Sequence, residues 1–167
     1  MDGTFAPPDF TVTTYLAATL YSVTPLPNDE VLVGGDFTRI DGEAHAGLAR
    51  LDKNGSLDTS FSSPTAFDTV KSTCLQADGS IWAGGVADTY SLDPLLVHLL
   101  ANGVTDTAFQ SSYHAAHDGG AVDIVMCDSS SLRWTAGIFS LIDGRPFYGL
   151  ARYLLLQNPV YVPFIVR

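Results

Sequence analysis

The chain has 167 residues, of which 46% are hydrophobic and only 16% are charged, a composition typical of a folded protein rather than a disordered one. Eight basic residues against 18 acidic ones give a net charge of −10, which argues against nucleic acid as a partner because phosphate binding depends on clustered lysine and arginine. The longest apolar runs are too short to span a membrane, and no basic segment followed by an apolar core is present at the amino terminus, so we expect neither membrane insertion nor a secretory signal.

The first predicted elements are short strands separated by turn-forming residues. Pro27-Asn28-Asp29 predicts a tight turn between the first two strands. Asn54-Gly55 predicts a type I′ hairpin turn, in which both central residues take positive φ. The pair Gly34-Gly35 weakens a strand interior and therefore indicates a bulge or a close backbone approach. The strands themselves are predicted over residues 23–26, 31–37 and 47–51.

These landmarks return further along the chain. The second glycines of the strand motif stand at positions 35, 85 and 137, so the steps are 50 and 52 residues. Gly-Leu-Ala-Arg ends at Arg50 and again at Arg152, and Asn54-Gly55 returns as Asn102-Gly103. The segment from Asp58 to Phe61 returns over 106–109. Several independent landmarks agree on a period of about fifty residues, and no helical period is sustained, so the sequence predicts an all-β fold of three units.

This succession of an apolar strand, Gly-Gly-x-Phe, Gly-Leu-Ala-Arg-Leu, Asn-Gly and Asp-Thr-Ser-Phe resembles the delta-60 repeat, a tandem repeat with a β-propeller-like fold. The first unit matches nearly throughout. The second keeps Gly84-Gly85 and Asn102-Gly103 but has Leu-Val-His-Leu in place of Gly-Leu-Ala-Arg. The third keeps Asp143-Gly144 and Gly-Leu-Ala-Arg and then departs. The resemblance covers most of residues 20–153 and implies a scaffold or a binding surface, not a reaction.

The landmarks predict one β domain over residues 1–153, with units of about 6–61, 62–109 and 110–153, and an apolar assembly arm over 154–167. The third unit lacks an Asp-x-x-Phe motif, whereas the chain opens with one, Asp2 to Phe5. This motif is predicted to complete a third unit, its own or a neighbour's, with Phe5 buried like Phe61. The blades are then closed by the chain termini or by oligomerisation. A β-trefoil or β-prism is the alternative, because propellers have four to eight blades.

Two segments resemble metal sites only in part. Asp52 to Asp58 mimics part of a calcium loop, but Leu100 stands where Asp52 stands in the second unit, so we interpret it as a hairpin turn. His114, His117 and Asp118 offer ligands for a transition metal, but they lie in a connector rich in serine and glycine. A solvated loop is the preferred interpretation there, and we predict no metal and no cofactor.

Templates for catalysis are absent from the sequence. It has no nucleophile elbow, no phosphate-binding glycine loop and no metalloprotease helix motif. Asp36 and Asp41 are carboxylates that could serve as an acid–base pair, but their positions in the repeat are better explained as turn and strand-end residues. Cys74 and Cys127 are too few for a disulfide framework and are predicted to be two free, buried thiols. We therefore predict that the protein is not an enzyme.

The carboxyl-terminal arm carries most of the predicted interaction residues. Apolar residues alternate over 160–166, which predicts an extended strand, and Pro159 and Pro163 confine it to a sheet edge or a pairing arm. The arm either supplies the missing strand of its own unit or adds a strand to another subunit or a host assembly. The predicted assembly residues are Phe5, Tyr153, Leu155, Val160, Tyr161, Val162, Phe164 and Ile165.

The sequence thus predicts a non-catalytic structural protein that assembles with itself and with a larger protein particle. A capsid cement or decoration protein, a tail-fibre protein or a baseplate protein of a virion would suit this design, with synthesis in the cytoplasm. A glycan- or cell-surface-binding module is the alternative, using aromatic residues such as Trp82, Tyr90 and Tyr113. A hydrolase that uses loop carboxylates is the third hypothesis.

Overall fold

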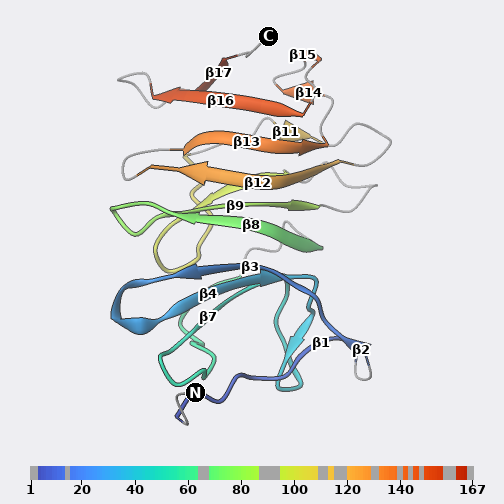
Figure 1. The fold of residues 1–167 in the computed structure, drawn as a ribbon, viewed down its shortest axis with the longest axis vertical. Helices are drawn as coiled ribbons and strands as arrows, with labels where there is room; N and C mark the ends of the chain where they lie inside the picture. The colour runs from blue at the N-terminus through green and yellow to red at the C-terminus, as the bar shows by residue number, and fades with distance from the viewer. Residues whose placement is uncertain are drawn as a thin grey trace.

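Three antiparallel sheets, one for each repeat, form the body of the protein in the computed structural model (Figure 1). The structure describes residues 4–13, 16–63, 68–86, 95–108, 113–114, 120–128, 132–138, 141–142, 145–146, 149–155 and 161–164. Unit 1 contains β3 (Leu20–Pro25), β4 (Val31–Gly35) and β7 (Leu48–Leu51). Unit 2 contains β8 (Thr69–Leu75), β9 (Ile81–Val86) and β10 (Leu96–Leu99). Unit 3 contains β12 (Ala121–Cys127), β13 (Leu132–Ile138), β16 (Leu150–Leu155) and β17 (Tyr161–Phe164). The prediction of an all-β fold built from three propeller-like units is confirmed.

Units 1 and 3 also carry small side sheets. In unit 1, β1 (Phe10–Thr13) pairs with β2 (Leu16–Ala17) and with β5 (Arg39–Ile40), which forms a hairpin with β6 (Glu43–Ala44). In unit 3, β11 (Tyr113–His114) pairs with β14 (Leu141–Ile142), which forms a hairpin with β15 (Arg145–Pro146). Phe10 pairs with Ile40, and Tyr113 pairs with Ile142, so the side sheets of units 1 and 3 follow the same repeat as the main sheets.

The hairpin turn at Asn54-Gly55 differs from the predicted type I′ turn. Only the glycine has a positive φ, 93°. The Gly55 N–H donates to the Asp52 carbonyl oxygen at 3.0 Å, and the Asp52 N–H donates to the Ser56 carbonyl oxygen at 2.9 Å. This is a longer loop that ends on one left-handed glycine. The Asp52 carboxylate stabilises it by accepting the N–H groups of Asn54 and Ser56, at 2.8 and 2.9 Å.

The second glycine of each unit occupies the same place in its sheet, as the repeat predicts. A Cβ on these glycines would lie 2.6, 2.0 and 2.2 Å from a backbone carbonyl oxygen, that of Thr19, Thr69 and Ala121, for Gly35, Gly85 and Gly137 respectively. The register between the first two strands of each unit shifts beside these positions, so the glycines accompany a β-bulge. The prediction that these glycines share their surroundings is confirmed.

The units pack face to face in chain order. β3 and β4 contact β8, and β8 and β9 contact β12. A buried cluster lies between units 1 and 2 and contains Leu32, Leu48, Phe61, Val70, Ile81, Ala83, Val97 and Leu99. Figure 1 shows units 1 and 3 extending in opposite directions, with β7 towards one end and β17 at the other. The strands of units 1 and 3 therefore do not close a ring within the described part of one chain. Among the described residues, no helix is long and apolar enough to cross a membrane.

Candidate assembly interface

The Asp-x-x-Phe segment that ends unit 1 fastens onto unit 2. Phe61 is buried, with 3% of its surface exposed. Ser62 donates its backbone N–H to the carbonyl oxygen of Asn102 at 2.8 Å. A Cβ on Gly103 would lie 2.0 Å from the Ser62 carbonyl oxygen and 2.8 Å from the Phe61 ring. The Asn-Gly turn of one unit thus receives the Asp-x-x-Phe segment of the preceding unit, and the glycine leaves room for it. We call this contact the latch.

The start of the chain makes the same latch on unit 1. Ala6 donates its backbone N–H to the carbonyl oxygen of Asn54 at 2.9 Å. A Cβ on Gly55 would lie 2.4 Å from the Ala6 carbonyl oxygen and 3.3 Å from the Phe5 ring. Phe5 is nevertheless 43% exposed, so the prediction that it is buried like Phe61 is wrong for the single chain. The reason is that Phe61 packs between units 1 and 2, whereas the described residues place only unit 1 against Phe5. Phe109, the third phenylalanine of the motif, lies outside the described residues.

Arg50, which ends the Gly-Leu-Ala-Arg motif, contacts both the Asp-x-x-Phe segment of unit 1 and the backbone of unit 2. Its Nε and Nη2 atoms each lie 2.7 Å from the Asp58 carboxylate oxygen Oδ2. Its Nη1 atom donates to the carbonyl oxygen of Ala101 at 3.0 Å. The guanidinium also lies 5.0 Å from the centre of the Phe61 ring. A guanidinium makes these contacts at once because its donors are fixed in a plane, which a lysine ammonium cannot reproduce.

In unit 2, His98 takes the place of Arg50. Asp106 donates its N–H to the His98 carbonyl oxygen at 2.9 Å, as Asp58 does to Arg50 at the same distance. The His98 Nδ1 atom lies 2.9 Å from the Asp106 carboxylate, and the ring lies 4.5 Å from that of Trp82. The pairing of Arg50 with Asp58 and of His98 with Asp106 was not predicted from the sequence. A signal was present, since both pairs are eight residues apart.

Hydrogen bonds lower the pKa values of the latch carboxylates. Ser60 donates its hydroxyl and its N–H to Asp58, and these bonds together with Arg50 lower the pKa of Asp58 below its ordinary value. The hydrogen bond from His98, followed by that from the Ala108 N–H, lowers the pKa of Asp106. A lowered pKa keeps a carboxylate ionised, which suits a structural acceptor better than a general acid.

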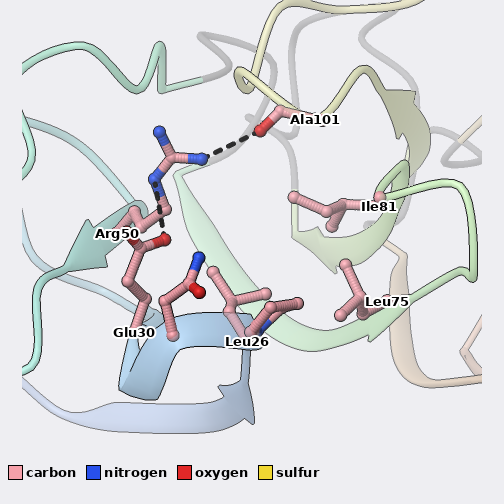
Figure 2. A pocket seen from close by; sticks show the side chains of 9 residues that line it. Leu26, Glu30, Arg50, Leu75, Ile81 and Ala101 are labelled. Atoms are coloured by element: carbon pink, nitrogen blue, oxygen red, sulfur yellow. Dashed lines mark hydrogen bonds and ion pairs between the residues drawn. The ribbon is translucent and has the colours of Figure 1, made fainter.

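A pocket of about 200 Å³ opens between units 1 and 2 beside Arg50 (Figure 2). Leu26, Leu75 and Ile81 form much of its apolar wall, and Glu30 lies 3.9 Å from the Arg50 Nε atom. Each of the three guanidinium nitrogens contacts an oxygen atom of the chain itself. The arginine of this pocket is therefore engaged in holding the two units together.

The first glycine of each pair receives a valine from the next unit. A Cβ on Gly34 would lie 2.8 Å from the Cγ1 atom of Val70, and a Cβ on Gly84 would lie 2.5 Å from the Cγ1 atom of Val122. Both valines are completely buried. In unit 3 the equivalent position, paired with β12 in the same register, is Ala136. The unit interfaces thus depend on glycine for close approach, and unit 3 departs from this rule.

A disulfide joins Cys74 on β8 to Cys127 on β12, so the prediction of two free thiols is wrong. The two residues are 53 positions apart, and their Cα atoms lie 6.0 Å apart. Equivalent strands of neighbouring units lie side by side, and this stacking, rather than any cysteine pattern, brings the sulfur atoms together. The disulfide fastens unit 2 to unit 3.

The predicted carboxyl-terminal arm forms a strand beside its own unit. Tyr153 pairs with Pro163, and Leu155 pairs with Tyr161, so β17 extends the sheet of unit 3 beyond β16. This is the arrangement in which the arm supplies a strand to its own unit. Of the other predicted assembly residues, Val162 and Phe164 lie on β17. Val160 and Ile165 fall outside the described residues.

The described residues of the two segments that resemble metal sites belong to a turn and a strand. Asp52 binds backbone N–H groups of its own turn, as the hairpin interpretation expects. His114 lies on β11, paired with Leu141, rather than in an open loop. His117 and Asp118 lie outside the described residues. Within the described part of the chain, no group of three or more His, Cys, Asp or Glu side chains is placed to hold a metal ion.

Three residues proposed for catalysis or glycan binding, Asp36, Asp41 and Trp82, make hydrogen bonds within the chain. Asp36 accepts the N–H of Thr19, and Asp41 accepts the N–H of Asp9 at 2.8 Å, as expected of turn and strand-end residues. Trp82 is completely buried and donates its Nε1–H to Gln76 at 2.8 Å, which corrects its expected role as an exposed aromatic residue. Tyr90 and the side chain of Tyr113 lie outside what the structure describes.

Comparison with known proteins gives a match to a family model. No curated protein and no solved structure matches the chain. Residues 26–61 and 76–109 match the model of a family described as a domain of unknown function (DUF5122) beta-propeller. Each segment runs from the first hairpin turn of a unit to the end of its Asp-x-x-Phe motif, so the two matches lie within units 1 and 2 and end where these units end. Over these two units the chain is similar to a propeller-like repeat family of unknown function.

Proposed function

We propose that this protein is a non-catalytic structural protein whose β units assemble into a larger protein particle. The observation that supports this most is the use of the charged residues of the repeat. Arg50 and Asp58 tie unit 1 to unit 2, and His98 and Asp106 repeat the pair in unit 2. An active site would instead direct polar groups of this kind into an open cavity towards a substrate.

The edge of unit 3 is the place that we propose for a partner strand. β17 is the last strand in the order β12-β13-β16-β17. An edge strand presents unpaired backbone groups, to which an extended segment of another protein can add. The predicted assembly residues Tyr161, Val162 and Phe164 lie on this strand, and Tyr153 and Leu155 lie on its neighbour β16.

A virion is the particle that we propose, with this protein as a capsid cement or decoration, tail-fibre or baseplate component. The repeat architecture supports this because stacked β units make a rigid scaffold from a short chain. The glycan-binding alternative is weakened, because Trp82 is completely buried and does not offer its ring to a sugar.

Purified particles from the source organism test this function. They are separated by density gradient, and the amount of this chain is measured by quantitative mass spectrometry in the particle and in the unassembled fraction. We expect a fixed ratio to the major particle protein. A variant that lacks residues 156–167 should remain folded by circular dichroism and fail to enter the particle. Full-length chain that stays in the unassembled fraction, or that binds a glycan array, would contradict the proposal.

A further inference from the structure

Inside the stack, the first strand of a unit is covered by the unit before it. Val70 on β8 and Val122 on β12 are completely buried, and Val125 on β12 is 6% exposed. Pairing with the second strand identifies Leu20 and Val23 on β3 as the equivalent positions in unit 1. Their exposed fractions are 42% and 65%. Unit 1 therefore presents to solvent the apolar positions that later units bury against a neighbour.

The face of unit 3 that points away from unit 2 also exposes apolar residues. Leu48 and Leu96 begin the third strands of units 1 and 2 and are completely buried. Leu150 begins the third strand of unit 3 and is 44% exposed. On β12, Ile124 and Met126 are 50% and 57% exposed. Unit 3 thus leaves uncovered the side on which units 1 and 2 each receive a following unit.

The chemistry of the two open faces matches. Between units 1 and 2, the hydroxyls of Ser22 and Thr24 lie 2.8 and 2.7 Å from the hydroxyl of Thr73. By strand register, the exposed Ile124 and Met126 of unit 3 are equivalent to Ser22 and Thr24. Val23 of unit 1 is equivalent to Thr73. Hydroxyls meet hydroxyls between units 1 and 2, whereas apolar side chains stand at both open faces. This is the pattern expected if the two open faces pack on each other.

The latch for such a junction is already in place. Unit 2 receives Phe61 and Ser62 from unit 1 on its Asn-Gly turn. Unit 1 receives Phe5 and Ala6 from its own amino-terminal segment on the equivalent turn. Unit 3 has no Asp-x-x-Phe motif after Arg152. If unit 3 of another copy packed before unit 1, the latch at that junction would come from the amino-terminal segment of the chain that contributes unit 1. Phe5, now 43% exposed, would then be covered as Phe61 is.

From these faces we infer that a second copy of this chain is the partner, with unit 3 of each copy packed on unit 1 of the other. This inference rests on the proposed structural function and names its first partner. Two copies supply six units, within the four to eight blades of propellers, and a closed ring removes the open faces. The side sheet that contains β1 does not prevent this packing. In unit 3 the equivalent strand β11 pairs with β14, and β12 of the same unit still packs on unit 2.

Single cysteine variants test the contact. Val23→Cys and Ile124→Cys chains are mixed and oxidised, and we expect a covalent dimer that contains one of each. Val104→Cys is the matched control, because Val104 is also exposed (43%) but lies on an Asn-Gly hairpin of unit 2. It should not couple to Val23→Cys beyond background. Coupling of Val23→Cys with itself, or equally with the control, would overturn the head-to-tail arrangement.

Sedimentation of the full chain tests the closed dimer. We expect a species of two 17.8 kDa chains, and Val23→Asp or Ile124→Asp should each convert it to monomer with an unchanged circular dichroism spectrum. The double variant Val23→Lys/Ile124→Asp should recover the dimer by placing opposite charges across each junction. A monomer at about 1 mM, where even weak contacts associate, or a ladder of larger species would overturn the dimer. A monomeric chain that still enters the particle would leave the proposed function standing, so the two failures are distinguishable.

Discussion

Gly85→Ala tests whether the second glycine of each unit is required for packing. The substituted Cβ would lie 2.0 Å from the carbonyl oxygen of Thr69 and 3.0 Å from its carbonyl carbon. Both are backbone atoms and cannot rotate away, so β8 and β9 have to move apart. That movement also strains the hydrogen bond of 3.0 Å from the Gly85 N–H to the Leu95 carbonyl oxygen.

The expected loss in the free energy of unfolding is the sum of three effects. Overpacking a well-packed site costs about 1–3 kcal/mol. A lost backbone hydrogen bond costs about 1 kcal/mol. The lower entropy of alanine in the unfolded chain offsets about 0.4–1 kcal/mol. We expect a net loss of about 1–3.6 kcal/mol, which lowers Tm by roughly 2–14 °C in a protein of this size. Valine at the same position should lose more.

Urea unfolding monitored by circular dichroism measures this loss, provided that the dependence of the free energy on urea is unchanged. Gly34→Ala is the matched control, because the nearest atom there is a Val70 methyl group at 2.8 Å, which belongs to a side chain that can shift. The control should lose less than Gly85→Ala. If the order is reversed, or if Gly85→Ala retains wild-type stability, contact with the backbone is not what requires glycine at this position.

Three further predictions follow from the unit contacts. Phe61→Ala should lose about 3–5 kcal/mol in urea unfolding and Phe5→Ala much less in the monomer, because only Phe61 is buried; equal losses would contradict the latch. Stability should fall as pH drops below about 4, because the folded-state pKa of Asp58 lies below its ordinary 3.8, so its contribution is present above that value and lost on protonation; Asp58→Asn should flatten this fall, and a parallel pH profile would exclude the effect. Reduction of the Cys74–Cys127 disulfide should cost about 2–4 kcal/mol, and a Cys74→Ser/Cys127→Ser variant that is insensitive to reductant is the control.

The repeat and its glycines were predictable because each landmark meets a backbone requirement. Gly35, Gly85 and Gly137 stand where a carbonyl oxygen approaches too closely for any side chain, and this requirement recurs at the repeat spacing. Gly55 and Gly103 have positive φ and leave room for the latch. The close carbonyl contact and the positive φ are requirements within one unit or one turn, so they remain visible in a single sequence.

The contacts between units were not predictable from the sequence alone. Cys74 meets Cys127, and Gly34 meets Val70, only because equivalent strands of successive units lie side by side. A repeat spacing reveals which residues are equivalent but not which face of one unit touches the next. The prediction for Asn54-Gly55 was wrong for a similar reason, since the side chain of Asp52 binds the turn and stabilises the longer loop.

The departures of unit 3 from the repeat give the chain a direction. Units 1 and 2 each offer a glycine to the valine of the next unit, whereas unit 3 has Ala136 at that position. Unit 1 ends in a latch that fastens onto the next unit, whereas unit 3 extends its sheet with β17. The amino-terminal segment restores the missing latch on the opposite face of the stack. A unit following unit 3 would therefore meet a face that has lost the glycine and the latch of the interior but exposes Ile124 and Met126. Unit 1 carries both a latch and the exposed Val23, so it fits that face better than a fourth unit of the interior type would.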